Sequence, residues 1–383
     1  MPKNRYIALY LPQFHPVDVN DKYWGKGFTE WTNTVKAKPL FRGHYQPHIP
    51  ADLGFYDLRM EECRIAQAEL AKAYGIEGFC YWYYWFGRGE TLLEMPIANV
   101  LESGKPDFPF AIAWANHSWT TSTWINNKKT AQLIKEQRYL GREDYERFFY
   151  HVLPLLQDKR YIRIDGRPMF MVHNPLDVPD TEIFIETWRT LANKNGIGNM
   201  FFIASSPGIR YNRVMEGKKI HTIPSLNDTE TLYSELLAMG YDAINSQNID
   251  RAELSIEGRL QYLIKFGLQH KTNIPILNKY SQEKLNKYIL SEFDKQENVF
   301  PSLFNNWDRS PRAGKKALII TESTPKVFAR LLKQASDIIK DKPFDKRIVF
   351  LRSWNEWGEG NHLEPDLKYG LGYLEAIKAE LER

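Results

Sequence analysis

The sequence predicts an α/β protein built as a single (β/α)8 TIM-type barrel with long active-site loops. Short apolar segments rich in β-forming residues alternate with amphipathic helical segments along the whole 383-residue chain. Eight of the apolar segments read as strands, which is the number that such a barrel needs. Aromatic and polar residues follow several of these strands directly, where a barrel of this kind carries its functional residues.

Each expected strand is short, apolar and typical of a buried parallel strand. The expected strands are Tyr6–Leu11, Gly78–Tyr83, Phe110–Trp114, Pro168–Val172, Met200–Ala204, Tyr241–Ile244, Val299–Phe304 and Ile348–Leu351. A further apolar run, Leu318–Thr321, could replace Val299–Phe304 as the seventh strand.

Helical periodicity marks the segments between the strands. The expected helices are Met60–Ala73, Asp144–Leu156, Thr181–Asn193, Arg251–Phe266, Gln282–Phe293, Pro325–Ile339 and Tyr373–Glu380. Arg210–Ser234 and Gly267–Lys279 show no clear period, and long loops on such a scaffold usually form the rim of the active site. No linker composition divides the chain, so we expect one catalytic barrel domain spanning residues 1–383.

Composition narrows the class of protein. The hydrophobic content of 43% is ample for a core, and the net charge of +4 comes from scattered basic residues. Scattered charge argues against a nucleic-acid partner, and no apolar stretch approaches the ~18 residues of a membrane span. The apolar run at the N-terminus is too short for a secretory signal, so we expect a cytoplasmic protein in which Cys63 and Cys80 stay reduced.

Two carboxylates, Glu356 and Glu359, follow the last expected strand and are the expected catalytic residues. They stand three positions apart beside Asn355 and Trp357. Carboxyl pairs among indoles suit the cleavage of glycosidic bonds, which needs an acid, a second carboxylate and aromatic faces for the sugar. If the segment turns helically, the two Cβ atoms lie ~5–6 Å apart, which favours a retaining over an inverting reaction. Alternatively, this stretch is a solvated loop whose tryptophans anchor the core.

The other strand ends supply a polyol-binding set of side chains. The aromatic content of 14% fits a pocket lined for stacking, although large cores also use aromatic residues. Within Tyr81–Phe86 we expect Tyr81 and Tyr83 in the core and Trp85 in the pocket. Asp308 has an alternative role, as a structural ion pair with Arg309 or Arg312. The expected substrate-binding residues are Glu30, Trp31, Trp85, Asn116, His117, Trp119, Asp308, Asn355 and Trp357.

The sequence predicts neither a metal nor a cofactor. His15, His44 and His48 lack the spacing of a zinc site, because the residues between 44 and 48 would not hold a helix. Phosphate-binding glycine loops and nucleophile elbows are not evident. A carbohydrate is therefore the expected partner, and the oligomeric state is not indicated.

Long motifs at these positions resemble those of the WbsX-type proteins, a glycoside hydrolase family 99-like group related to endo-α-mannosidases. The motifs include Tyr10–Pro16, Trp24–Asn33, Gly43–His48, Trp114–Asn116 and Trp354–Gly360. The resemblance implies a (β/α)8 barrel and a retaining mechanism through a 1,2-anhydro sugar. Glu356 would be the base that takes the proton of the sugar 2-hydroxyl, and Glu359 the acid and then the base for water. Such an acid must be protonated near neutrality, so we expect a raised pKa at Glu359 and an ionised Glu356.

Two residues depart from the family pattern. His117 replaces a carboxylate in the Trp-Ala-Asn run, and Arg309 replaces the asparagine after Asn306–Asp308. Both changes make this end of the barrel more positive, which favours an anionic sugar such as a uronic or sulfated residue.

The leading hypothesis is a retaining glycoside hydrolase acting on a bacterial surface polysaccharide or its oligosaccharides. One alternative is a glycosyltransferase of lipopolysaccharide or capsular polysaccharide biosynthesis, although the chain lacks an Asp-x-Asp motif and a nucleotide-binding glycine loop. A third reading is a non-catalytic carbohydrate-binding protein.

Overall fold

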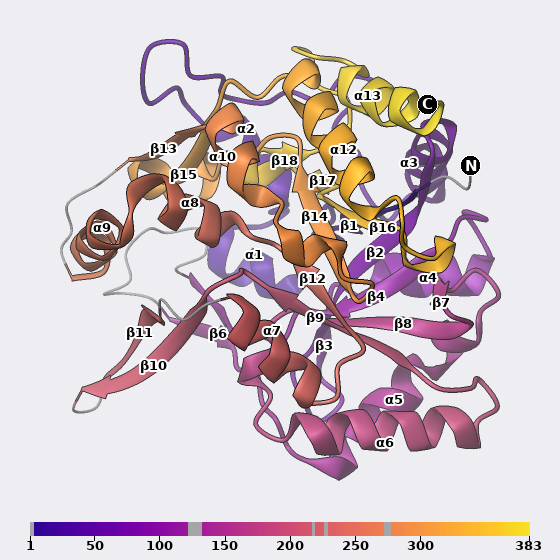
Figure 1. The fold of residues 1–383 in the computed structure, drawn as a ribbon. Helices are drawn as coiled ribbons and strands as arrows, with labels where there is room; N and C mark the ends of the chain where they lie inside the picture. The colour runs from indigo at the N-terminus through magenta and orange to yellow at the C-terminus, as the bar shows by residue number, and fades with distance from the viewer. Residues whose placement is uncertain (1–3, 122–131, 217–218, 226–228, 272–276) are drawn as a thin grey trace.

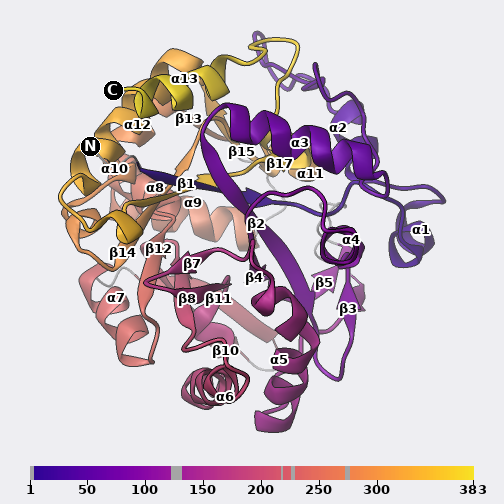
Figure 2. The same ribbon diagram turned by 90° about the vertical axis from the view of Figure 1, so that its right-hand side faces the viewer.

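The computed structural model describes residues 4–121, 132–216, 219–225, 229–271 and 277–383. Eight parallel strands pair side by side, and the first closes on the last to complete a barrel (Figures 1 and 2). In spatial order the strands are β1 (Arg5–Tyr10), β2 (Ile76–Trp85), β4 (Phe110–Trp114), β8 (Arg167–Val172), β9 (Phe201–Ser206), β12 (Ala243–Ser246), β14 (Val299–Phe304) and β16 (Ile348–Arg352). All eight expected strands are therefore confirmed, with ends that differ by a few residues.

Helices surround the barrel and cover its strands (Figure 2). They include α3 (Glu61–Ala73), α4 (Met95–Ser103), α5 (Arg142–Gln157), α6 (Thr181–Lys194), α7 (Thr229–Ala238), α12 (Pro325–Ile339) and α13 (Gly372–Leu381). The helix expected over Arg251–Phe266 is two helices, α8 (Ile249–Glu257) and α9 (Arg259–Lys271). Gly258 separates them with a φ of 78°, a conformation that ends a helix and that glycine adopts without strain.

The two segments without a clear period contain additional elements. Arg210–Ser234 includes the antiparallel hairpin of β10 (Arg210–Glu216) and β11 (Lys219–Ser225), which projects from the barrel in Figure 1. Gly267–Lys279 covers the end of α9 and the start of β13 (Asn278–Ser281), and part of each segment lies outside the described residues. The apolar run Leu318–Thr321 forms β15 and pairs with β13, so it does not compete for the seventh barrel position.

Further short elements lie in the connections between the barrel strands and helices. They are α1 (Asp18–Trp24), α2 (Glu30–Lys36), α10 (Gln282–Ile289), α11 (Ser310–Ala313), β3 (Thr91–Leu92), β5 (Trp119–Thr120), β6 (Leu133–Lys135), β7 (Arg163–Ile164), β17 (Asn355–Glu356) and β18 (Asn361–His362).

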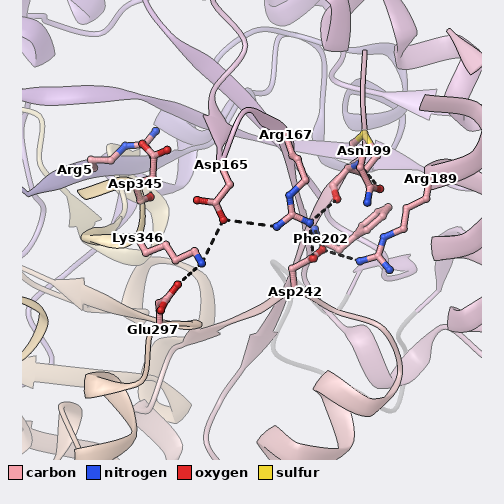
Figure 3. A network of polar contacts seen from close by, with 11 residues as sticks. Arg5, Asp165, Arg167, Arg189, Asn199, Phe202, Asp242, Glu297, Asp345 and Lys346 are labelled. Carbon is pink, nitrogen blue, oxygen red and sulfur yellow. Dashed lines mark hydrogen bonds and ion pairs between the residues drawn. The ribbon is translucent and has the colours of Figure 1, made fainter. Parts of the chain in front are cut away.

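An ionic network crosses the N-terminal face of the barrel, where the strands begin (Figure 3). Asp242, just before β12, accepts bonds from Arg167 at 2.7 Å and from Arg189 at 2.8 Å. Lys346, just before β16, pairs with Asp165 at 3.3 Å and with Glu297. These contacts tie the starts of β8, β12, β14 and β16 together around the barrel.

Within the described ranges, no helix is long and apolar enough to cross a membrane. Cys63 and Cys80 are both free thiols, as expected for reduced cysteines.

Candidate active site

Three carboxylates and one guanidinium meet at the C-terminal face of the barrel. Glu356 and Glu359 follow β16, and Glu359 ends a 3₁₀ turn that begins at Trp357. Glu30 is the first residue of α2, and Arg312 belongs to α11, which follows β14. Parallel strands end on the same face, so residues far apart in sequence are brought together here.

Arg312 joins the three carboxylates. One nitrogen, Nη1, donates to Glu356 at 2.9 Å and to Glu359 at 2.7 Å, and Nη2 donates to Glu30. Because both Oε1 atoms bond the same nitrogen, they are at most about 5.6 Å apart, closer than the ~6.5–9.5 Å of an inverting pair. Burial disfavours the charge on Arg312, but the surrounding carboxylates outweigh burial and raise its pKa well above the ordinary value.

Glu359 receives the most donors of the three carboxylates. Besides Arg312, the Arg309 Nε donates to it at 3.1 Å and the Trp307 indole at 2.9 Å. Burial alone would raise the pKa of Glu359, but the two guanidiniums and the indole lower it below its usual range. Glu359 is therefore ionised in this structure.

The pKa values of Glu356 and Glu30 are raised rather than lowered. Burial and the neighbouring charge of Glu359 raise the pKa of Glu356, against the opposing pull of Arg312. Burial likewise raises the pKa of Glu30 to about 7, because one arginine does not offset complete removal from water. The expectation of a raised pKa at Glu359 is thus wrong, because the donors around it lower that pKa. Of the two carboxyls, Glu356 has the higher pKa, because three donors stabilise the charge of Glu359.

Gly358 permits this close approach. A Cβ built on it would lie 2.0 Å from the Glu30 Oε2 and 3.2 Å from the Arg312 Nε. Any side chain at this position would displace Glu30, so the glycine between Trp357 and Glu359 has a steric reason.

An aromatic rim lies beside the acid cluster, which consists of Glu30, Glu356 and Glu359 around Arg312. The Tyr84 ring lies 5.1 Å from that of Trp119 and 6.1 Å from that of His117. Burial is the main cause that raises the pKa of Tyr84, and the charge of Glu356 adds to it, which places Tyr84 close to the acids. His117 is exposed and Trp119 is half-buried, so both are available to a ligand.

Trp85 does not lie in the pocket, contrary to expectation. Its indole stacks on Phe148 of α5 with ring centroids 4.7 Å apart and donates to Asp144 at 3.1 Å. Side chains alternate along a strand, so Trp85 shares the helix-facing side of β2 with Tyr83, whereas Tyr84 faces the other side.

Asn116 and Asn355 hold the backbone rather than an open site. Asn116 donates to the Asn174 carbonyl and accepts from the Asn174 amide, both at 2.8 Å. Asn355 makes the same pair of bonds with the backbone of Leu11, at 3.0 and 2.7 Å. Both amides are fully buried, so their expected role in binding substrate gives way to joining neighbouring strand ends.

Among side chains, Asp308 contacts His44 and Gln46 rather than Arg309 or Arg312. Its Oδ2 accepts from the Gln46 amide at 2.7 Å and lies 2.6 Å from the His44 Nε2. These contacts outweigh burial and lower the pKa of Asp308. Asp308 therefore anchors the N-terminal loop beneath the site, and both earlier interpretations of its partner are corrected.

Trp31 and Trp357 are buried next to the acid cluster. Their rings lie 5.5 Å apart, the Trp31 indole donates to the Tyr56 carbonyl, and the Trp357 indole donates to Glu364 at 2.6 Å. Trp357 is 1% exposed and Trp31 8%, so both rings are packed into the protein and offer little surface to a substrate, contrary to their expected role.

Arg312, Tyr84 and Trp307 complete the site and were not among the predicted residues. A strict two-residue alternation in β2 would have selected Tyr84. Trp307 lies in the Asn306–Asp308 motif, in which Asp308 was the predicted binding residue. Arg312 carries no local pattern, since its importance comes from three partners distant in sequence.

Comparisons with known proteins agree with this architecture. A family model described as "Glycosyltransferase WbsX" matches residues 6–377. The uncharacterized protein WxcX of Xanthomonas campestris pv. campestris is 32% identical over 98% of this chain. The match covers 49% of WxcX, so the chain spans about half the length of this relative.

Two solved structures share the fold. A glycoside hydrolase-like protein superposes with a TM-score of 0.59 at 14% identity, covering 100% of this chain and 94% of the other. The GH99 endo-alpha-mannosidase from Bacteroides thetaiotaomicron gives 0.55 at 11% identity, covering 100% of this chain and 98% of the other. At such identities the likeness shows the fold alone.

Proposed function

Since this chain belongs to the WbsX family, we propose that it is a retaining glycoside hydrolase that uses Glu356 and Glu359. One observation carries the proposal: two carboxylates bond the same guanidinium nitrogen at the strand ends, with their pKa values pushed in opposite directions. Paired carboxyls whose surroundings separate their pKa values can act as an acid and a base at one pH.

The hydrogen bonds favour Glu356 as the acid and Glu359 as the base. Glu359 takes the proton of the sugar 2-hydroxyl, whose oxygen attacks C1 to form the 1,2-anhydro sugar. The bond from C1 to the leaving oxygen breaks, and that oxygen takes the proton of Glu356. Water then attacks C1 as the C1–O2 bond breaks; the water loses a proton to Glu356, and Glu359 returns its proton to O2. This order reverses the roles that the family resemblance implies.

Aryl glycosides with leaving groups of different acidity test these roles. Glu356→Gln should retain more activity on substrates with good leaving groups, because these depart without a proton. The same pattern in Glu359→Gln would restore the order of the family resemblance. Retention is tested separately, by following the anomer of the first product by proton NMR.

A bacterial surface polysaccharide, or an oligosaccharide derived from it, is the proposed substrate. Arg309 is 47% exposed although its Nε is bonded to Glu359, and the exposed His117 lies at the rim. These groups favour an anionic sugar over a neutral one. Hydrolysis rates on matched acidic and neutral oligosaccharides check this, and a preference for the neutral chain would contradict it.

A glycosyltransferase is the second candidate, because the matching family carries that description. Incubating the protein with nucleotide sugars and acceptor glycans separates the two functions by their products.

In a non-catalytic binding protein, the Arg312 cluster would serve packing alone. Glutamine at 356 and 359 would then leave sugar affinity unchanged in a protein without hydrolase activity.

A further inference from the structure

A second polar cluster lies behind the acid site. His48, His362 and Asp366 each offer one ligand atom, and these atoms all lie within 4.8 Å of one another. His48 lies in the N-terminal loop, the segment between α2 and α3, whereas His362 and Asp366 follow the Trp354–Gly360 motif. All three residues are at most 5% exposed.

The two imidazoles are oriented as metal ligands usually are. The His362 Nδ1 lies 2.9 Å from the Glu364 carbonyl, so it carries the hydrogen and leaves the lone pair of Nε2 available. That Nε2 lies 2.9 Å from the His48 Nδ1. A metal-binding histidine commonly donates its other N–H to a backbone carbonyl in this way.

Asp366 supplies an oxygen that lacks a hydrogen bond of ordinary geometry. Its Oδ1 accepts from the backbone amides of Lys368 at 3.0 Å and Tyr369 at 2.7 Å. Its Oδ2 is buried and accepts no hydrogen bond of ordinary geometry, and the buried Tyr45 hydroxyl lies close enough to interact with the Asp366 carboxylate. A buried carboxylate oxygen without a well-placed donor is costly, so it calls for a partner such as a cation.

We propose that His48, His362 and Asp366 bind one divalent transition-metal ion of the zinc class. Two imidazole nitrogens and a carboxylate oxygen suit zinc, whereas calcium and magnesium prefer sites made of oxygen alone. Donor atoms around a tetrahedral zinc lie about 3.3 Å apart, so small side-chain shifts would close the site. Water or the Tyr45 hydroxyl can complete the coordination.

The ion would join the N-terminal loop to the segment that carries the acid cluster. The Leu367 amide already donates to the Ile49 carbonyl at 3.0 Å, and the His362 ring stacks on Trp357 at 3.6 Å. Trp357 directly follows Glu356 in the sequence. Metal binding would therefore stiffen the support of the site without taking part in the reaction, and it does not depend on the proposed function.

The competing arrangement is metal-free. The His48 Nδ1 would donate to His362, and the Tyr45 hydroxyl would turn to donate to Asp366, whose charge raises the tyrosine pKa. Lys368, which packs over the Tyr45 ring at 4.5 Å, would balance the carboxylate.

Metal analysis of the full chain distinguishes the two arrangements. The protein is stripped with a chelator and dialysed against zinc, and the bound metal is measured by plasma mass spectrometry and titration calorimetry. We expect one zinc per chain and a higher melting temperature with zinc. Asp366→Asn should weaken binding by at least about tenfold while keeping an oxygen for the backbone amides. His151→Asn, on α5 and outside the cluster, is the matched control and should bind as the unmodified protein does.

Two results would overturn the proposal. Unmodified protein that takes up no zinc, with a melting temperature insensitive to zinc and chelator, supports the metal-free pair. Equal zinc binding by the unmodified protein and Asp366→Asn would place the ion elsewhere. The first measurement needs no variant, so a variant that fails to fold does not leave the question open.

Discussion

The two ends of the barrel handle charge in opposite ways. At the N-terminal end, opposite charges alternate: Asp242 lies between Arg167 and Arg189, and Lys346 between Asp165 and Glu297 (Figure 3). At the C-terminal end, three carboxylates converge on Arg312. The same residue types therefore form a balanced network at one end and an acid-rich cluster at the other.

Exposure to water explains what each arrangement can do. The side chains of Asp165 and Glu297 are 38% and 54% exposed, so water screens their ion pairs and each contributes little to stability. The side chains of Glu30, Glu356 and Glu359 are only 0–14% exposed. Burial and unequal hydrogen bonding therefore give these carboxyls different pKa values. The comparison indicates that one end holds partly exposed, balanced ion pairs, while the other holds buried carboxyls with separated pKa values.

The largest effect should come from removing the ionised carboxylate of the acid cluster. Glu359→Gln should lower kcat/KM on a cleavable glycoside by ~10²–10⁴-fold, because amides do not accept protons. Glu297→Gln, the same change at the N-terminal face, should leave kcat/KM unaltered. Activity of Glu359→Gln at the level of the unmodified protein would refute the assignment of the active site.

Next in size is the loss of the shared guanidinium. Arg312→Met should lower the free energy of unfolding by about 3–5 kcal/mol, because it leaves buried carboxylates without their cation. Arg189→Met, on the partly exposed network, should cost about 1 kcal/mol or less. Urea unfolding measures both changes. Equal losses would mean that the two ends do not differ in the way described.

A pH effect of intermediate size should come from Glu30. Its folded pKa of about 7 exceeds the unfolded value near 4.3, so the folded state holds a proton that the unfolded state has released. The free energy of unfolding therefore falls as the pH rises from about 4.5 to 7. Glu30→Gln should reduce the difference in unfolding free energy between pH 5 and 8 by on the order of 1–3 kcal/mol. An unchanged pH difference in urea titrations would contradict a buried, protonated Glu30.

Glu359 should act in the opposite pH window. Its lowered pKa contributes stability above the unfolded pKa, and that contribution is lost as pH falls below about 4.3. Stability measured from pH 5 down to pH 3 should therefore fall less steeply in Glu359→Gln than in the unmodified protein.

The smallest effect should come from Lys346→Met at the N-terminal face. It should change the free energy of unfolding by about 0–1 kcal/mol, and 1 M salt should remove most of that change, because the pairs are partly exposed. A loss of several kcal/mol that persists in high salt would place this network among the buried clusters.

Hydrophobic patterning predicted all eight barrel strands, although it left Leu318–Thr321 as an alternative to the seventh until strand pairing decided between them. Buried strands such as Val299–Phe304 are set by the residues within them, and the structure has that strand at the predicted bounds. The positions of Glu356 and Glu359 after the last strand followed from the same count. Alternation in β2 puts Trp85 on the same side as Tyr83, but aromatic residues on both sides concealed which side faces the site.

The sequence by itself determined the barrel and the strand end that carries the two glutamates, since both depend on short-range periodicity and chain order. Tertiary structure alone decided which of the two carboxyls has the higher pKa. That outcome depends on Arg312, Trp307 and Arg309 reaching Glu359 from another strand end. The energy of a buried charge is set by neighbours in space, and no local pattern around Glu359 encodes them.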